Sequence, residues 1–202
     1  MRNLLRDLGV AGVLLVVIPS LADAQWGVTV SLQRTGFSGT SLDTSTGGTE
    51  GSFRPGNTPA VTLRLDRRFG RFAVGLGVRY SRSAIVLDTR DLFAGFHNEV
   101  TTIEAAPEVR VRVLHTRLGA SVHAYGGPVI GVWMLQDQGT RSVAGVMAGI
   151  LGEFPLLDKL ALEVRVGGGF TRSVFRDGEL PPVFERRTMR RSEIALGLRY
   201  GR

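Results

Sequence analysis

The sequence contains no cysteine and a single lysine. Without cysteine the chain can form neither disulfides nor thiolate metal sites. The net charge of +7 is carried almost entirely by arginines that are interspersed with acidic residues. Proteins that bind nucleic acids more often gather their basic residues into clusters. We therefore expect neither a zinc site nor a nucleic-acid partner.

No hydrophobic run is long enough to cross a bilayer as a helix, which takes roughly 20 residues. The apolar stretch at residues 8–18 follows two arginines and precedes an Ala-Asp-Ala sequence that ends at Ala24. This order of segments is typical of a secretory signal peptide. We predict that residues 1–24 are a cleaved signal peptide and that residues 25–202 form one exported domain.

Alternation of apolar and polar residues recurs through the rest of the chain. In residues 160–166, large apolar side chains are separated by small or charged ones, including Glu163 and Arg165. A period of two places alternate side chains on opposite faces of a strand. We predict eight strands, over residues 26–33, 60–66, 71–81, 102–113, 117–133, 142–154, 159–169 and 192–200.

Two of these segments leave their orientation open. In residues 117–133, the Gly126-Gly127-Pro128 run permits a bulge that would reset the alternation. In residues 142–154, neither alternate set is clearly the outward one. The faces of the fifth and sixth strands therefore stay unassigned.

The connections between the predicted strands differ in length. Residues 67–71, 115–117 and 155–159 are short turns. Residues 36–59, about fifteen residues ending at Glu99, and residues 172–191 are longer and mostly polar. The first long connection is rich in Gly, Ser and Thr, so we expect it to be flexible. Short turns alternating with longer loops are typical of an up-and-down barrel in the outer membrane.

The polar faces of the predicted strands decide between a barrel in lipid and a barrel in water. Their charged residues share each face with many Gly and Ala residues, which a water-facing surface does not require but a crowded interior does. We therefore favour an all-β, eight-stranded antiparallel transmembrane barrel over a soluble periplasmic lipid-binding barrel. The charged residues predicted to face the lumen are Arg64, Asp66, Arg79, Glu104, Glu108, Arg110, Arg112, Glu163, Arg165, Glu193 and Arg199.

The signal peptide, the alternating strands, the long and short loops and the final segment EIALGLRYGR, residues 193–202, resemble one known family. It comprises the small eight-stranded outer-membrane barrels of the OmpA and OmpX type. The resemblance covers essentially all of residues 26–202. It implies a location in the bacterial outer membrane and leaves the function open.

No combination of residues predicts catalysis or a cofactor. The three histidines are scattered, since His97 is expected in a long loop, His115 in a short turn and His123 on the lumen face of a strand. A metal site or a Ser-His-Asp triad needs side chains that converge. Ser83, His97 and Ser173 are conceivable members of an enzyme site, but no spacing singles them out. We expect no enzyme, no metal and no cofactor.

The predicted lumen charges allow two functions. Paired charges could form a plug that stiffens the barrel, or an exchangeable gate along a narrow path for small solutes. An eight-stranded barrel is just wide enough for its own side chains, which favours the plug. We expect a monomer with a structural or surface-interaction role.

Arginines gather in the last long connection. They are Arg172, Arg176, Arg186, Arg187, Arg190 and Arg191, and they outnumber the acidic residues there. Such a patch near the outer leaflet could bind the phosphates of lipopolysaccharide or another acidic partner. A solvated loop with Arg-Glu pairs is the alternative.

Overall fold

The computed structural model describes residues 25–38, 40–41, 51–89, 93–136, 139–176, 179 and 188–201. The predicted signal peptide lies outside these residues and stays a prediction. Every element of regular structure in the described part is a β-strand. No helix among these residues is long and apolar enough to span a membrane.

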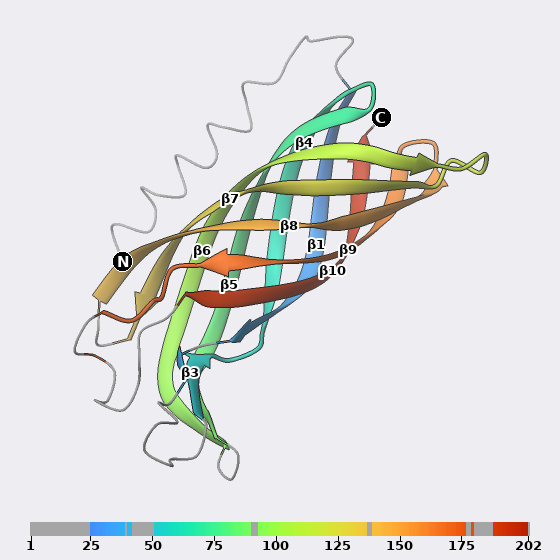
Figure 1. The fold of residues 1–202 in the computed structure, drawn as a ribbon. Coiled ribbons are helices and arrows are strands. Elements are labelled where there is room, and N and C mark those ends of the chain that lie inside the picture. The colour runs from blue at the N-terminus through green and yellow to red at the C-terminus, as the bar shows by residue number, and fades with distance from the viewer. Residues whose placement is uncertain are drawn as a thin grey trace, which may run out of the picture.

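The strands form a single antiparallel sheet that closes on itself (Figure 1). They are β1 (Gln25–Ser38), β2 (Thr40–Ser41), β3 (Gly51–Pro55), β4 (Thr58–Phe69), β5 (Phe72–Thr89), β6 (Phe93–His115), β7 (Ser121–Leu135), β8 (Gly139–Leu157), β9 (Leu160–Thr171) and β10 (Met189–Gly201). Neighbouring strands follow the order β2-β3-β5-β4-β1-β10-β9-β8-β7-β6, and pairing of β5 with β6 completes the ring. Strands β1 and β4 to β10 make up the barrel, so the predicted eight-stranded up-and-down fold is confirmed.

The connections divide between the two ends of the barrel as predicted. The turn at Gly70 and Arg71, the turn at residues 116–120 and the turn at residues 158–159 lie at the end that also holds Gln25 and Gly201. Gly70 and Gly119 have φ of 61° and 84°, a left-handed conformation that favours glycine. The other connections lie at the opposite end, called the loop end below; those between β5 and β6 and between β7 and β8 span three residues each, so the predicted contrast in length holds for the other two.

The loop end contains more strand than the sequence predicts. The predicted connection of about fifteen residues that ends at Glu99 is mostly strand: β5 runs to Thr89 and β6 starts at Phe93, so His97 lies in a strand. Residues 51–55 form β3, which pairs with the extension of β5. These strands project beyond the barrel at the end opposite the C-terminus (Figure 1). Hydrogen bonding between neighbouring extensions explains the difference, because a loop-like composition does not prevent pairing with an adjacent strand.

The orientations left open by the sequence are settled by burial. In β7 the odd-numbered residues face inward from Ser121 to Leu135, so the Gly126-Gly127-Pro128 run does not reset the alternation. In β8, Ala144, Val146, Ala148 and Ile150 face outward, and the opposite set faces the lumen. The register shift lies instead in β6, between Arg112 and Leu114.

Candidate functional site in the barrel lumen

All the predicted lumen residues except Arg112 are buried inside the barrel. The buried ones are Arg64, Asp66, Arg79, Glu104, Glu108, Arg110, Glu163, Arg165, Glu193 and Arg199. Arg112 is only half-buried, because it stands next to the register shift at the short-turn end of β6. Burying an unpaired charge is very costly, so the partners of the other residues decide what the lumen can do.

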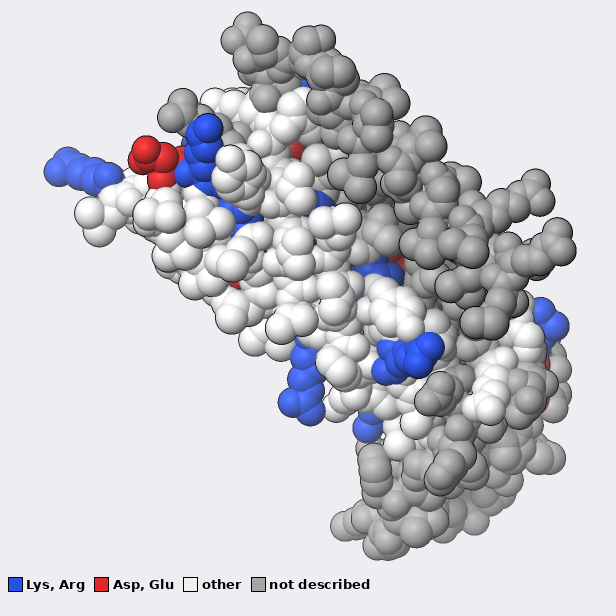
Figure 2. Space-filling model, turned by 180° about the vertical axis from the view of Figure 1, so that it is seen from behind, with Lys and Arg blue, Asp and Glu red and all other residues white. Residues whose placement is uncertain are grey.

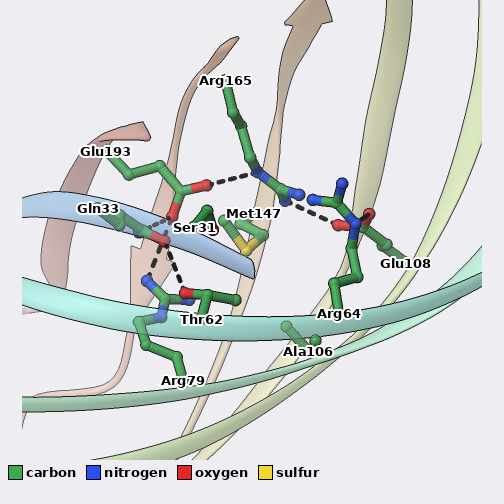
Figure 3. Close-up of a pocket in the computed structure, with 11 residues that line it drawn as sticks. Ser31, Gln33, Thr62, Arg64, Arg79, Ala106, Glu108, Met147, Arg165 and Glu193 are labelled. Atoms are coloured by element: carbon green, nitrogen blue, oxygen red, sulfur yellow. Dashed lines mark hydrogen bonds and ion pairs between the residues drawn. The ribbon is translucent and has the colours of Figure 1, made fainter. Parts of the chain in front are cut away.

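Glu193 on β10 is the centre of the group nearest the loop end (Figure 3). Its carboxylate accepts hydrogen bonds from Arg79 Nη1 at 3.2 Å and Arg165 Nε at 3.0 Å. Gln33 Nε2 and the Tyr125 hydroxyl also donate to it, at 2.7 and 3.0 Å. The Arg165 guanidinium lies 3.6 Å from the centre of the Tyr125 ring, a cation–π contact. Side chains from four other strands, β1, β5, β7 and β9, therefore meet at this one carboxylate.

Glu104 on β6 extends this group around the barrel wall. It lies 3.2 Å from Arg79 Nε and accepts a hydrogen bond from Arg191 Nη1 at 2.8 Å. Arg79 therefore bridges Glu104 and Glu193. Arg191 was predicted to belong to a surface patch in the last loop, and this is wrong: the residue lies in β10, faces inward and is buried. The predicted strand began one residue later, which left Arg191 outside the alternation.

Glu108 and Glu163 form the middle of the charged lumen. Arg165 Nη2 lies 2.7 Å from Glu108, and Arg64 pairs with Glu163. Arg64 Nε is also 3.6 Å from Glu108, and Arg110 Nη1 is 3.7 Å from Glu163. Each of these carboxylates therefore faces more than one guanidinium, so the pairs form one connected network.

Asp66 anchors the network toward the short-turn end. It is fully buried, with Arg110 Nη2 at 2.7 Å and Arg199 Nη2 at 3.2 Å. Nearer the end of the barrel, Arg68 pairs with Glu153, and these side chains are 20% and 11% exposed. The network therefore runs from a buried interior to a partly exposed rim.

Glycines make room for the long lumen side chains. A Cβ placed on Gly27 would collide with the guanidinium of Arg199. One placed on Gly167 would collide with the hydroxyl of Tyr125. Glycine therefore shares the inward faces with charged residues for a steric reason. This is the combination that, in the sequence, indicated a narrow barrel interior.

An apolar cluster, called the mouth cluster below, fills the loop end of the lumen. It comprises Ile85, Val100, Trp133, Leu135, Val143, Val174, Phe175 and Met189, with Phe37 packed against it. The rings of Phe37 and Trp133 meet edge to face, with centroids 5.4 Å apart. Strands from around the barrel thus close this end with side chains that carry no charge.

Part of the mouth cluster comes from the connection after β9. Val174 and Phe175 turn into the barrel and are buried. Arg141 on β8 donates a hydrogen bond to the carbonyl of Val174, and its Nη2 lies 2.6 Å from Glu179 Oε1. Glu179 also accepts from the backbone N–H of Arg176 at 2.7 Å. Arg141 thus ties this segment to the barrel wall.

A second apolar group continues along β7 and β8 beside the charges. It contains Ala106, Tyr125, Val129, Met147 and Leu151. Between this group and the charged residues, an interior hollow is lined by Ser31, Thr62, Arg64, Met147 and other residues (Figure 3). Its volume is about 20 Å³, which is room for about one water molecule.

Several inward-facing polar residues, of which Arg68 is only partly buried, were missed from the sequence. They are Gln33, Arg68, Tyr125, Arg141, Glu153 and Arg191. Arg68, Arg141 and Arg191 lie just beyond the predicted strand ends and keep the inward phase of those strands. Extending the alternation by one or two residues would have found them. Glu153 lies in a strand whose orientation the sequence left open.

The histidines occupy separate positions in the fold. His123 faces the lumen, with its Nε2 2.9 Å from Ser121 Oγ, and His115 lies in β6 near the short turn. No group of three potential metal ligands occurs in the part of the chain that is described. The partners identified for the buried carboxylates are mainly arginines.

The outer surface of the barrel is apolar. Strand β1 exposes Val28, Val30 and Leu32, and β10 exposes Ile194, Leu196 and Leu198. Figure 2 shows one face, where the described middle is mainly neither acidic nor basic. An apolar exterior around a charged interior is the reverse of a soluble barrel and suits a bilayer. The soluble lipid-binding barrel considered from the sequence is therefore excluded.

No protein-family model matches this chain, and no similar curated protein was found. Solved structures do match its fold. Neisserial surface protein A superimposes with a TM-score of 0.52 at 11% identity, over 87% of this chain and 96% of that one.

Two further structures come from other bacteria. OprG of Pseudomonas aeruginosa gives a TM-score of 0.52 at 10% identity, over 89% of this chain and 96% of that one. A major outer membrane protein from Thermus thermophilus gives 0.54 at 14% identity, over 89% and 100%. At these identities the likeness concerns the fold. This chain therefore has the fold of the small eight-stranded barrels of the bacterial outer membrane, the location that its apolar exterior also requires.

Proposed function

We propose that this chain is a structural and surface component of the outer membrane whose lumen is plugged. The observation that carries the proposal is the filling of the described part of the lumen, where the hollow among the charged residues has a volume of about 20 Å³. One water molecule fits there, whereas a hydrated ion needs a continuous wider path. The protein then contributes a stable scaffold and loop-end surfaces rather than a channel.

Two different fillings in series support the plug. The charged network occupies the middle and the short-turn side, and the mouth cluster occupies the loop end. An ion would have to displace paired arginines and then pass apolar side chains that offer it no ligands. Each of these steps is unfavourable for a charged solute.

Reconstitution into planar lipid bilayers tests the proposal. Purified barrel should give no discrete conductance steps at voltages where a wide porin, inserted in the same membrane as a control, conducts. Folding before insertion is checked by the heat-modifiable mobility of the barrel on gels. Reproducible single-channel steps from the folded protein would contradict the plug.

A narrow ion path is the second candidate. Arg79 contacts both Glu104 and Glu193, and Arg165 contacts both Glu108 and Glu193. A guanidinium with two carboxylate partners can exchange one for the other, which favours movement within the network. In this case Arg79→Gln would change the conductance or its voltage dependence. If the lumen is plugged, neither the wild type nor Arg79→Gln conducts.

We further propose that the barrel acts as a monomer that contacts lipid phosphates at its loop end. Pairing of β5 with β6 closes the barrel, which supports a barrel that is complete in one chain. Of the predicted phosphate-binding arginines, Arg172, Arg176 and Arg190 are exposed, which supports this role for them. Arg186 and Arg187 lie outside the described residues.

A further inference from the structure

The loop-side edge of the apolar exterior is marked by arginines. On β1 the exposed residues Val28, Val30 and Leu32 are followed at the next outward position by Arg34. On β5 the outward Tyr80 is followed by Arg82, which is also exposed. Arg172, just after β9, and Arg190 on β10 are exposed further toward the loop end. A guanidinium at this height lies where the acyl region of an outer leaflet meets its head groups.

Two of these arginines border open hollows on the outside of the barrel, at the seam between β1 and β10. One hollow, of about 420 Å³, is lined by Arg54, Asn57, Arg190 and Ser192 among others. The second, of about 310 Å³, is lined by Arg34, Val166 and Ile194 among others. Both hollows are also lined by Gly36, Asn57 and Ser192, so they adjoin.

Gly36 keeps the space between the hollows open. A Cβ at this position would lie 2.9 Å from Ser192 Oγ and 3.3 Å from Asn57 Oδ1. Any larger residue would therefore crowd two polar groups that face the same groove. The joined hollows are called the seam groove below.

The charge of the seam groove is positive. Arg34 and Arg190 are exposed at it, and Arg54 reaches Asn57 Oδ1 at 3.5 Å. Among the described residues, the only carboxylate lining either hollow is Glu193, which is buried and faces the lumen arginines. Arg191 borders the groove but directs its guanidinium inward to Glu104. An anion in the groove would thus meet guanidinium groups and polar donors rather than a described exposed acid.

From this geometry we infer that the seam groove binds a phosphate group of an outer-leaflet lipid. Arginine suits this ligand because its planar fork donates two hydrogen bonds to phosphate oxygens. A lipid fits better than a free anion because the groove continues directly onto the apolar wall. Ile194, next to Arg34 in the β1–β10 pairing, is 55% exposed, and Leu32 is 70% exposed. The head group would lie at the arginines and the acyl chains along these side chains.

This inference deepens the proposed lipid contact and moves it from the last loop to the barrel wall. It rests on the proposed function only in requiring that the barrel lies in the outer membrane. The side chains of Arg34 and Arg190 are outside the lumen, so their replacement leaves a plugged or conducting interior as it was. A failure of the lipid-binding inference can therefore be distinguished from a failure of the proposed plug.

The test uses the mature barrel in phosphatidylcholine nanodiscs that contain a minor fraction of a bis-phosphorylated glycolipid, lipid A. Native mass spectrometry after transfer to detergent measures how much glycolipid stays bound. Arg34→Gln with Arg190→Gln should lower the retained fraction by roughly tenfold, since two charge-assisted contacts are lost. The matched control, Arg71→Gln with Arg117→Gln, removes two exposed arginines at the short-turn end and should retain as much as the wild type.

Three results would overturn the inference. Equal retention by the seam and control variants would show that these arginines do not hold the lipid. Equal retention of dephosphorylated lipid A would show that phosphate is not the group recognised. Release of the lipid by inorganic phosphate at equal concentration would assign the groove to a free anion. Gel mobility and bilayer conductance of the same samples establish that the seam variant is folded and that its lumen is unchanged.

Discussion

The two ends of the lumen are filled in opposite ways. Toward the short turns, β4, β6, β9 and β10 supply arginines and carboxylates that pair across the barrel. At the loop end, the apolar mouth cluster fills the lumen, and the buried Arg141 beside it pairs with Glu179. A pair of buried charges is stable only while both members are present, whereas an apolar contact depends on volume and shape. The first region should therefore be sensitive to charge and the second to size.

The largest effect is expected from removing the charge of Glu193 without changing its shape. Glu193→Gln leaves Arg79, Arg165 and Arg191 facing an amide in a dry interior. We expect a loss of about 4 kcal/mol in the free energy of unfolding, as for a broken buried pair. Equilibrium urea unfolding in lipid vesicles measures it. Ser192→Ala, at the exposed neighbouring position, is the control, and a Glu193→Gln effect no larger than that control would disprove the charged network as a stabilising unit.

The mouth cluster should respond to volume. Met189→Ala deletes a fully buried side chain, and we expect a loss of about 3 kcal/mol from the transfer and cavity terms. Met189→Leu keeps the volume and should cost less than about 1.5 kcal/mol. The same urea titration compares the two variants. If Met189→Leu lowered the free energy of unfolding as much as Glu193→Gln does, the two ends of the lumen would not differ in their sensitivity to charge and size.

Crowding within the charged region should have an intermediate effect. Gly27→Ala places a methyl group against the guanidinium of Arg199 and pushes it away from Asp66. We expect a loss of about 1–2 kcal/mol, as for overpacking of an interior. Gly77→Ala is the matched control, because its nearest neighbours would be 3.8 Å away. Equal stability of the two variants would mean that Arg199 is not held tightly.

The smallest effect is expected at the partly exposed end of the network. Glu153→Gln removes the partner of Arg68 where water reaches both side chains. We expect a loss below about 1 kcal/mol, because exposed ion pairs contribute little and are screened by salt. Unfolding in low and high salt should show the difference shrinking with salt for Glu153→Gln. A loss as large as that of Glu193→Gln would place this pair in the dry interior.

The charged half of the lumen could be predicted because apolar and polar residues alternate clearly in its strands and the charged residues all fall on the polar face. Arg64, Asp66 and Glu163 each occupy the polar phase of a strand whose other phase is plainly apolar. The mouth cluster could not be predicted in this way. Val143 and Leu135 are apolar residues that face inward on strands whose outward faces are apolar too, so the pattern carries no contrast.

Other parts of the site depend on contacts that no local pattern records. Val174 and Phe175 follow a strand end, and the hydrogen bond from Arg141 to Val174 and the packing around Trp133 hold them in the barrel. Arg191 was misplaced because β10 begins earlier than the alternation suggests. Arg112 was expected inside, but the register shift beside it leaves it half-buried.

The extension of β5 and β6 sets how far this protein reaches from the cell. Strand β6 has 23 residues, and crossing an outer membrane takes about 9 to 11 of them. Its residues 93–99 lie beyond the pairing with β7, which starts at Val100, and at about 3.3 Å per residue they amount to roughly 23 Å of strand. Backbone pairing with β3 makes this projection a sheet rather than a loose tether. A particle or antibody approaching from outside would contact this projecting sheet above the head groups before it contacted the barrel.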